Sequence, residues 1–140
     1  MSAATYRWLV LASVFFMAAS TAVALLVPSL IPVALTVALE SEPVEGFLAD
    51  HPFIMLALTL PWLIAGLAST VGLLFFRHWA RTVALYSTVL GFVFYPFFGP
   101  TVTSALANAL SEASYVLWGA VLALSFYGPI SERFVADGKS

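Results

Sequence analysis

The sequence predicts an all-α membrane protein in which four transmembrane helices form a bundle in a single domain, residues 1–140. The first observation behind this fold class is composition: 62% of the residues are hydrophobic, 9% are charged, and the mean hydropathy is +1.03. An ordinary soluble domain carries about 25% charged residues. The second is the placement of the charges, which leaves four charge-free stretches at residues 8–39, 51–76, 82–111 and 113–131. Because a membrane-crossing helix needs about 20 apolar residues, each stretch has room for one span.

The predicted spans, in chain order, are residues 8–27, 53–76, 82–98 and 105–127. The apolar run that holds the first span is too long for one crossing, so we expect the helix to end at Pro28 or Pro32, because proline removes a helix hydrogen bond. Pro61 is expected to kink the second span, and Pro96 to end the third.

The N-terminus has features of a secretory signal peptide. Arg7 precedes an apolar run, and residues 22–24 read Ala-Val-Ala, which is a cleavage-site pattern. The apolar run continues well past that pattern. We therefore expect an uncleaved first span.

The basic residues predict the orientation of the bundle. All five of them lie on one side of the four predicted spans: Arg7, Arg77, Arg81, Arg133 and Lys139. The loop at about residues 40–52, on the other side, is acidic, and we interpret it as a solvated loop. Basic residues in short loops stay in the cytoplasm. Both termini are therefore predicted to be cytoplasmic (N-in/C-in), in an integral membrane protein of a bacterial-type inner membrane.

Aromatic residues fit this arrangement. Tyr6, Trp8 and Trp79 fall at the predicted inner boundary, where amphipathic rings favour the headgroup level. Trp62 and Trp118 fall within spans, and we expect them to pack between helices.

The chain lacks the residues that several membrane chemistries need. It has no cysteine, which excludes thiolate metal sites and disulfides. Its one lysine, Lys139, lies outside the spans and cannot hold retinal, and His51 and His78 are predicted on opposite membrane faces, where they cannot share a haem. We therefore predict no catalytic residues, no metal site, no cofactor, no nucleic-acid partner and no enzymatic activity.

A polar stripe marks one face of the fourth span: Ser104, Asn108, Glu112, Tyr115 and Gly119. The apolar run after Glu112 is too short to cross the bilayer alone, which places this carboxylate inside the hydrocarbon region. Because an ionised group is costly there, we expect Glu112 to face protein, with Asn108, Tyr95 or His51 beside it. The alternatives are a glutamate that reaches the headgroups, or a hydrogen bond that only holds two spans together.

Arg77 and Arg81 lie one helical turn apart and are candidates for contact with lipid headgroups or a partner. We interpret them chiefly as anchors of the span ends. Rows of small residues, which suit close packing of membrane helices, are expected to pack within the chain, and the alternative is a dedicated face for oligomer contact: Ala18/Ala22, Ala68/Gly72, Ser87/Gly91, Ala105/Ala109/Ala113 and Gly119/Ala123.

The function predicted from these observations is a non-catalytic accessory or structural subunit that packs against other membrane proteins. The reason is the absence of a reactive set of residues, together with very short segments outside the bilayer. The alternative is a small transporter, or a bundle that binds lipid or another ligand through Glu112. The expected partners are the lipid bilayer and either other membrane subunits or further copies of the chain.

Overall fold

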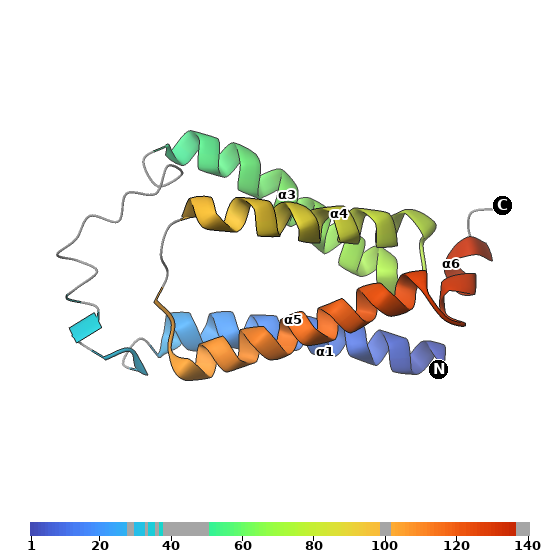
Figure 1. Ribbon diagram of the computed structural model, residues 1–140, viewed down its shortest axis with the longest axis horizontal. Coiled ribbons are helices and arrows are strands. Elements are labelled where there is room, and N and C mark those ends of the chain that lie inside the picture. The colour runs from blue at the N-terminus through green and yellow to red at the C-terminus, as the bar shows by residue number, and fades with distance from the viewer. Residues whose placement is uncertain (28–29, 33, 36, 38–50, 99–101, 137–140) are drawn as a thin grey trace.

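The computed structural model describes residues 1–27, 30–32, 34–35, 37, 51–98 and 102–136. Its main elements are listed in chain order: α1 (Ala3–Leu26), α3 (Pro52–Leu74), α4 (His78–Phe94), the 3₁₀ helix η2 (Tyr95–Phe98), α5 (Ala105–Phe126) and α6 (Ser131–Ala136). All the regular structure in these residues is helical (Figure 1), which confirms the predicted all-α class. The predicted break at Pro28 and the acidic loop 40–50 lie outside the described residues.

Three of the helices are long and apolar enough to cross a membrane: Ala3–Leu26, Phe53–Leu74 and Ala105–Phe126. They match the first, second and fourth predicted spans. The third predicted span corresponds to α4, which has 17 residues, and to η2, which extends it. α1 begins five residues earlier than predicted, because Ser2 caps it by accepting a hydrogen bond from the Thr5 amide at 3.1 Å.

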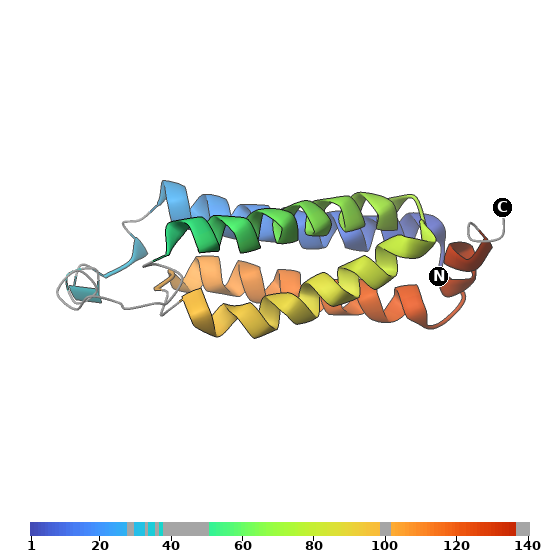
Figure 2. The ribbon, with the colours of Figure 1, turned by 90° about the horizontal axis from the view of Figure 1, so that it is seen from above.

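The four long helices form two pairs. α1 packs mainly against α5, and α3 mainly against α4. The pairs lie together at the end of the bundle that holds the N-terminus and α6, as both ribbon views show (Figures 1 and 2). α3 and α4 are joined there by a tight turn in which the Arg77 amide donates to the Gly72 carbonyl and the Phe76 amide to the Leu73 carbonyl. This is a Schellman turn, with Phe76 in the left-handed conformation at φ 57°.

The contact between α1 and α5 is built on small residues seven positions apart. The buried positions are Ser13 and Ser20 on α1, and Ala107, Ser114 and Val121 on α5. The Ser20 hydroxyl donates to the Ala107 carbonyl at 2.7 Å, and the Ser114 hydroxyl donates to the Ser13 carbonyl at 2.8 Å. A seven-residue repeat is typical of helices that cross at about 20°. The small side chains let each hydroxyl reach a backbone carbonyl of the other helix.

The predicted small-residue rows are wrong for α1 and α5. Their members are exposed, apart from the partly buried Ala113: Ala18, Ala22, Ala105, Ala109, Gly119 and Ala123. The serine-bearing face turns inward on both helices, where Ser20 and Ser114 bond to carbonyl groups of the other helix. The alanine rows turn outward.

The glycines of the rows on α3 and α4 contribute to packing as predicted, whereas Ala68 is exposed. A side chain at Gly72 would clash with Ala80, and one at Gly91 would clash with the Trp62 ring. The indole of Trp62 also donates to the Ser87 carbonyl at 2.7 Å. The indole of Trp118 on α5 donates to the Thr88 hydroxyl of α4 at 2.9 Å, so both tryptophans pack between helices as expected.

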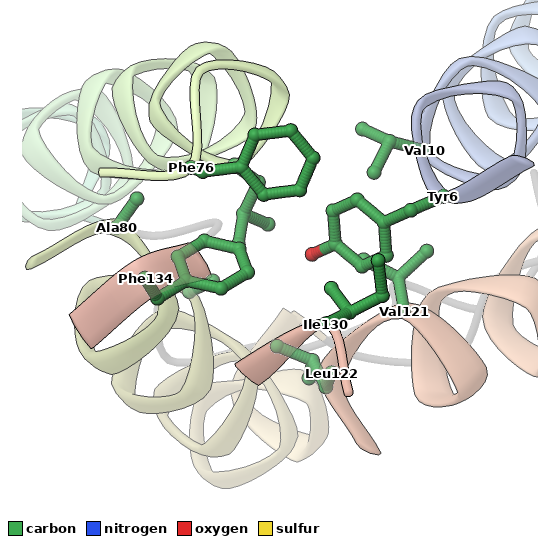
Figure 3. Packing of buried hydrophobic residues seen from close by; sticks show 10 residues of the cluster. Tyr6, Val10, Phe76, Ala80, Val121, Leu122, Ile130 and Phe134 are labelled. Carbon is green, nitrogen blue, oxygen red and sulfur yellow. The ribbon is translucent and has the colours of Figure 1, made fainter. Parts of the chain in front are cut away.

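A cluster of buried apolar residues joins the two helix pairs (Figure 3). Its members come from α1, α3, α4, α5 and α6 and from the α3–α4 and α5–α6 turns: Tyr6, Val10, Leu73, Phe76, Ala80, Ala84, Val121, Leu122, Ile130 and Phe134. We call it the end cluster, because it lies where the N-terminus of α1 meets α6. Tyr6 is fully buried there. Its side chain therefore packs inside the bundle and does not face the surroundings of the helix end.

Candidate functional site

Asn108 and Glu112 form a hydrogen-bonded polar pair on α5. The Asn108 amide nitrogen donates to one carboxylate oxygen of Glu112 at 2.8 Å. The two residues lie one helical turn apart, a spacing that brings side chains together. Asn108 is therefore the predicted neighbour that Glu112 contacts. Among the described side chains, the structure shows no bond from Glu112 to Tyr95 or His51.

The expectation that Glu112 faces protein is wrong for the chain taken alone, because both side chains of the pair are exposed. α5 packs on α1 through the face that holds Ala107, Ser114 and Val121. Glu112 is two residues from Ser114, which turns it about 200° round the helix from the packed face. The carboxylate therefore points away from α1.

The rest of the predicted polar stripe does not gather around the pair. Ser104 is buried and caps α5, because its hydroxyl oxygen accepts a hydrogen bond from the Ala107 amide at 3.2 Å. Tyr95 lies in η2, and both Tyr95 and Tyr115 are exposed. The stripe therefore reduces to the Asn108–Glu112 pair, with Tyr115 one turn further along the same helix.

Apolar residues, several of them small, surround the pair on the exposed side of α5. We call this surface the outer face of α5, made of Asn108 and Glu112 with the exposed residues Ala105, Leu106, Ala109, Tyr115, Val116, Gly119, Ala120 and Ala123. A side-chain carbon placed on Gly119 would meet no atom within 4 Å. The outer face is thus open within this chain, and it combines two polar groups with small residues and a few larger apolar ones.

Glu112 lies about a third of the way along α5. The helix has 22 residues and is about 33 Å long, close to the thickness of a hydrocarbon core of about 30 Å. Glu112 is seven residues after Ala105, about 10 Å along the axis from the start of the helix. Glu112 is therefore more than one turn inside this apolar helix, whereas Asn108 is within one turn of its start.

Arginines gather at the other end of the bundle, where two of them bond to carbonyl groups of neighbouring helices. The Arg7 Nε donates to the Leu74 carbonyl at 3.0 Å, and an Arg81 terminal nitrogen donates to the Ser125 carbonyl at 3.3 Å. Each bond joins one helix pair to the other. Arg81 was predicted as a headgroup or partner contact, and it has this additional structural role. Arg77, its predicted companion, is exposed at the start of α4.

The same end of the bundle places guanidinium groups over aromatic rings. Arg7 and Arg133 lie 5.3 and 5.8 Å from the centre of the Phe76 ring. Arg81 lies 5.9 Å from the centre of the Phe134 ring. Cation–π contacts at such distances contribute about 0.5–1 kcal/mol where the cation is exposed. These arginines therefore reinforce the end cluster from its rim.

The Tyr6 hydroxyl has no hydrogen-bond partner among the described residues, although it is buried. Figure 3 shows it pointing into the apolar end cluster.

A buried hydroxyl without a partner costs about 1–3 kcal/mol, so Tyr6→Phe should raise the free energy of unfolding by about 1 kcal/mol. Thermal unfolding in detergent measures this. Tyr86→Phe is the control, because Tyr86 is exposed, and should change nothing. A loss of stability in Tyr6→Phe would show that the hydroxyl has a partner.

A shallow apolar cavity of about 380 Å³ lies between α3 and α4, with Pro61 and Trp62 in its wall. Its lining is apolar apart from the polar groups of Trp62, Tyr86 and Ser87, and it contains no acidic or histidine side chain. In the described part of the chain, no three histidine, aspartate or glutamate residues come together as metal ligands. The Asn108–Glu112 pair is therefore the strongest candidate for a functional interaction.

No protein family, no curated protein and no solved structure matches the chain.

Proposed function

We propose that this protein is a non-catalytic subunit of a membrane assembly, which packs against another membrane protein through the outer face of α5. The observation that carries the proposal is the exposed Asn108–Glu112 pair on a helix long and apolar enough to cross a membrane. Lipid tails offer no hydrogen bonds. Polar side chains in spans usually face protein or a water-filled cavity. Since α1 and α5 bury the opposite face, the protein that covers this pair is a different chain.

The small residues of the outer face support the same proposal. Membrane helices associate through close backbone contact, which glycine and alanine allow. Ala109, Gly119 and Ala123 leave α5 with such a surface, and the chain's own helices do not use it. A partner helix that packs there buries the polar pair and these small residues together.

The exposed position of Glu112 also bears on the alternative function. A transporter or ligand-binding bundle built around Glu112 needs this carboxylate on an interior path between helices. Glu112 is instead on the outside of the α1–α5 pair. This position favours a packing subunit over a conduit inside this chain.

The proposal includes four spans with both termini in the cytoplasm, in a bacterial-type inner membrane. α4 and η2 together are the third span. The arginine-rich end of the bundle is also the end with the N-terminus and α6 (Figure 1), and the positive-inside rule makes this the cytoplasmic end.

This orientation predicts a labelling pattern, which is simple to read because the chain has no cysteine. Thr103→Cys changes an exposed residue just before α5, at the opposite end from α6, and should react with an impermeant maleimide added to whole cells. Glu132→Cys, on α6, should react only after the membrane is opened. The reverse pattern would contradict the orientation, and labelling of both variants in whole cells would indicate dual insertion.

Photo-crosslinking tests the packing function. A photoreactive aromatic residue at Val116, on the outer face, should form one discrete protein adduct in native membranes. The matched control is Leu11 on α1, which is exposed and lies at the same level as Val116, because Ser13 is bonded to Ser114. A crosslinker at Leu11 should give only lipid adducts.

A second comparison tests the shape of the outer face. Gly119→Ile, which places a bulky side chain on the face, should abolish the protein adduct from Val116. Gly66→Ile is the matched change on α3, where a new side-chain carbon also meets no atom within 4 Å, and it should leave the adduct intact. Lipid adducts alone from Val116, or equal protein adducts from Val116 and Leu11, would refute the packing function.

A further inference from the structure

We propose that the partner covers the outer face of α5 with a transmembrane helix that carries a lysine or arginine at the depth of Glu112. This inference rests on the proposed function and adds the chemistry of the partner. The juxtaposition behind it is an exposed carboxylate, about 10 Å along a membrane-spanning helix, on a face of small residues.

The chain does not supply a cation to Glu112 from its described residues. The arginines lie around the end cluster, where Arg81 bonds to the Ser125 carbonyl. Ser125 is 13 residues from Glu112 along α5, a distance of about 20 Å. Lys139 lies outside the described residues. His51 directly precedes α3, in the other helix pair.

The hydrogen bond to Asn108 leaves most of the carboxylate's capacity available. A carboxylate has two oxygens with about four acceptor positions, and an asparagine amide has two N–H donors. The structure shows one bond between the two groups and, within the described residues, no other bond from either side chain. A lysine or arginine within about 4 Å satisfies the remaining positions and offsets the charge, which is how buried ionic groups are tolerated in spans.

The small residues around Glu112 are suited to a long basic side chain. Ala109 and Gly119 let a partner backbone come close to α5. A lysine or arginine side chain from that backbone then lies along the helix surface, with its charged group at Glu112.

A second copy of the chain does not provide this chemistry. Two copies with the same orientation place their outer faces at the same depth, so that Glu112 meets Glu112. Like charges at short distance repel. All five basic residues of the sequence lie outside the predicted spans. A second copy therefore offers no lysine or arginine within a span to pair with Glu112. The occupant is therefore a different chain, whose charge complements this one.

The experiment combines the Val116 crosslinker with changes at Glu112 and identifies the crosslinked peptide by mass spectrometry in native membranes. The peptide should come from a transmembrane segment with a lysine or arginine within one helical turn of the crosslinked residue. The adduct should fall by about 30-fold in Glu112→Gln, because breaking a desolvated charge pair costs at least about 2 kcal/mol. It should persist in Glu112→Asp, which keeps the charge, and in the control Glu132→Gln, which alters an exposed glutamate on α6.

Charge exchange completes the test. Changing the partner's basic residue to glutamate should remove the adduct, and combining that change with Glu112→Lys should restore it. A protein adduct whose peptide lacks a basic residue, comes from this chain, or is indifferent to Glu112→Gln would overturn the inference and leave the packing function standing. Lipid adducts alone would overturn both. An unchanged melting temperature in Glu112→Gln shows that a lost adduct is not a loss of fold.

Discussion

Phe134→Ala is expected to lower the free energy of unfolding by about 3–5 kcal/mol, the usual cost of removing a buried phenylalanine side chain. Phe134 is fully buried, although it belongs to a six-residue helix outside the predicted spans. Its ring packs edge-on against Phe76 at 5.3 Å between centres, and against Tyr6 at 5.9 Å. The loss leaves a cavity where the two helix pairs meet. Urea or thermal unfolding of the protein in mild detergent measures the effect.

The neighbouring residue provides the control for Phe134→Ala. Val135 is 43% exposed, and Val135→Ala should cost less than about 0.5 kcal/mol, as is usual for a surface position. Equal losses in the two variants would show that α6 does not pack on the bundle. Loss in Phe134→Ala alone would show that α6 holds the helix pairs together.

The end cluster explains why α6 has such an effect in a small bundle. Elsewhere each pair is held mainly by its own internal contacts. Among the described residues, three side-chain hydrogen bonds join the pairs: Arg7 to Leu74, Arg81 to Ser125 and Trp118 to Thr88. Two of these three bonds lie beside the end cluster. The pairs are therefore joined chiefly at their arginine-rich end.

The positions of the membrane helices followed from the sequence because charged residues are excluded from apolar spans. The helix starts were less accurate, since a cap such as Ser2 extends α1 through residues that contact the end cluster. α6 was not predicted, because six residues are too few for a periodic pattern to emerge. Ile130 and Phe134, two large apolar residues four positions apart, were the available signal.

The polar pair of the candidate site was predictable, but the side of α5 on which it lies was not. The four-residue spacing predicted the bond of Glu112 to Asn108. The side of α5 that packs inward was not given by hydrophobicity, because nearly every face of a membrane helix is apolar. The serines at seven-residue intervals, Ser13 with Ser20 on α1 and Ser114 on α5, determined it.

Ser114→Leu is the strongest test of that serine-built contact, and should lower the free energy of unfolding by about 3 kcal/mol. Ser114 is 2% exposed, and its hydroxyl donates to the Ser13 carbonyl at 2.8 Å. A leucine there has no space unless α1 and α5 move apart, which also breaks the neighbouring bond from Ser20 to the Ala107 carbonyl. Unfolding in mild detergent measures the loss.

Two controls separate the causes of that loss. Ser114→Ala removes the hydroxyl without adding volume, and should cost only about 0.6 kcal/mol, the typical value of a hydrogen bond between membrane helices. Ala18→Leu adds a bulky side chain to α1 at an exposed position, and should be neutral. If Ala18→Leu were as damaging as Ser114→Leu, the alanine row and not the serine row would form the contact. The outer face of α5 would then be the packed face, and Glu112 would lie inside the bundle.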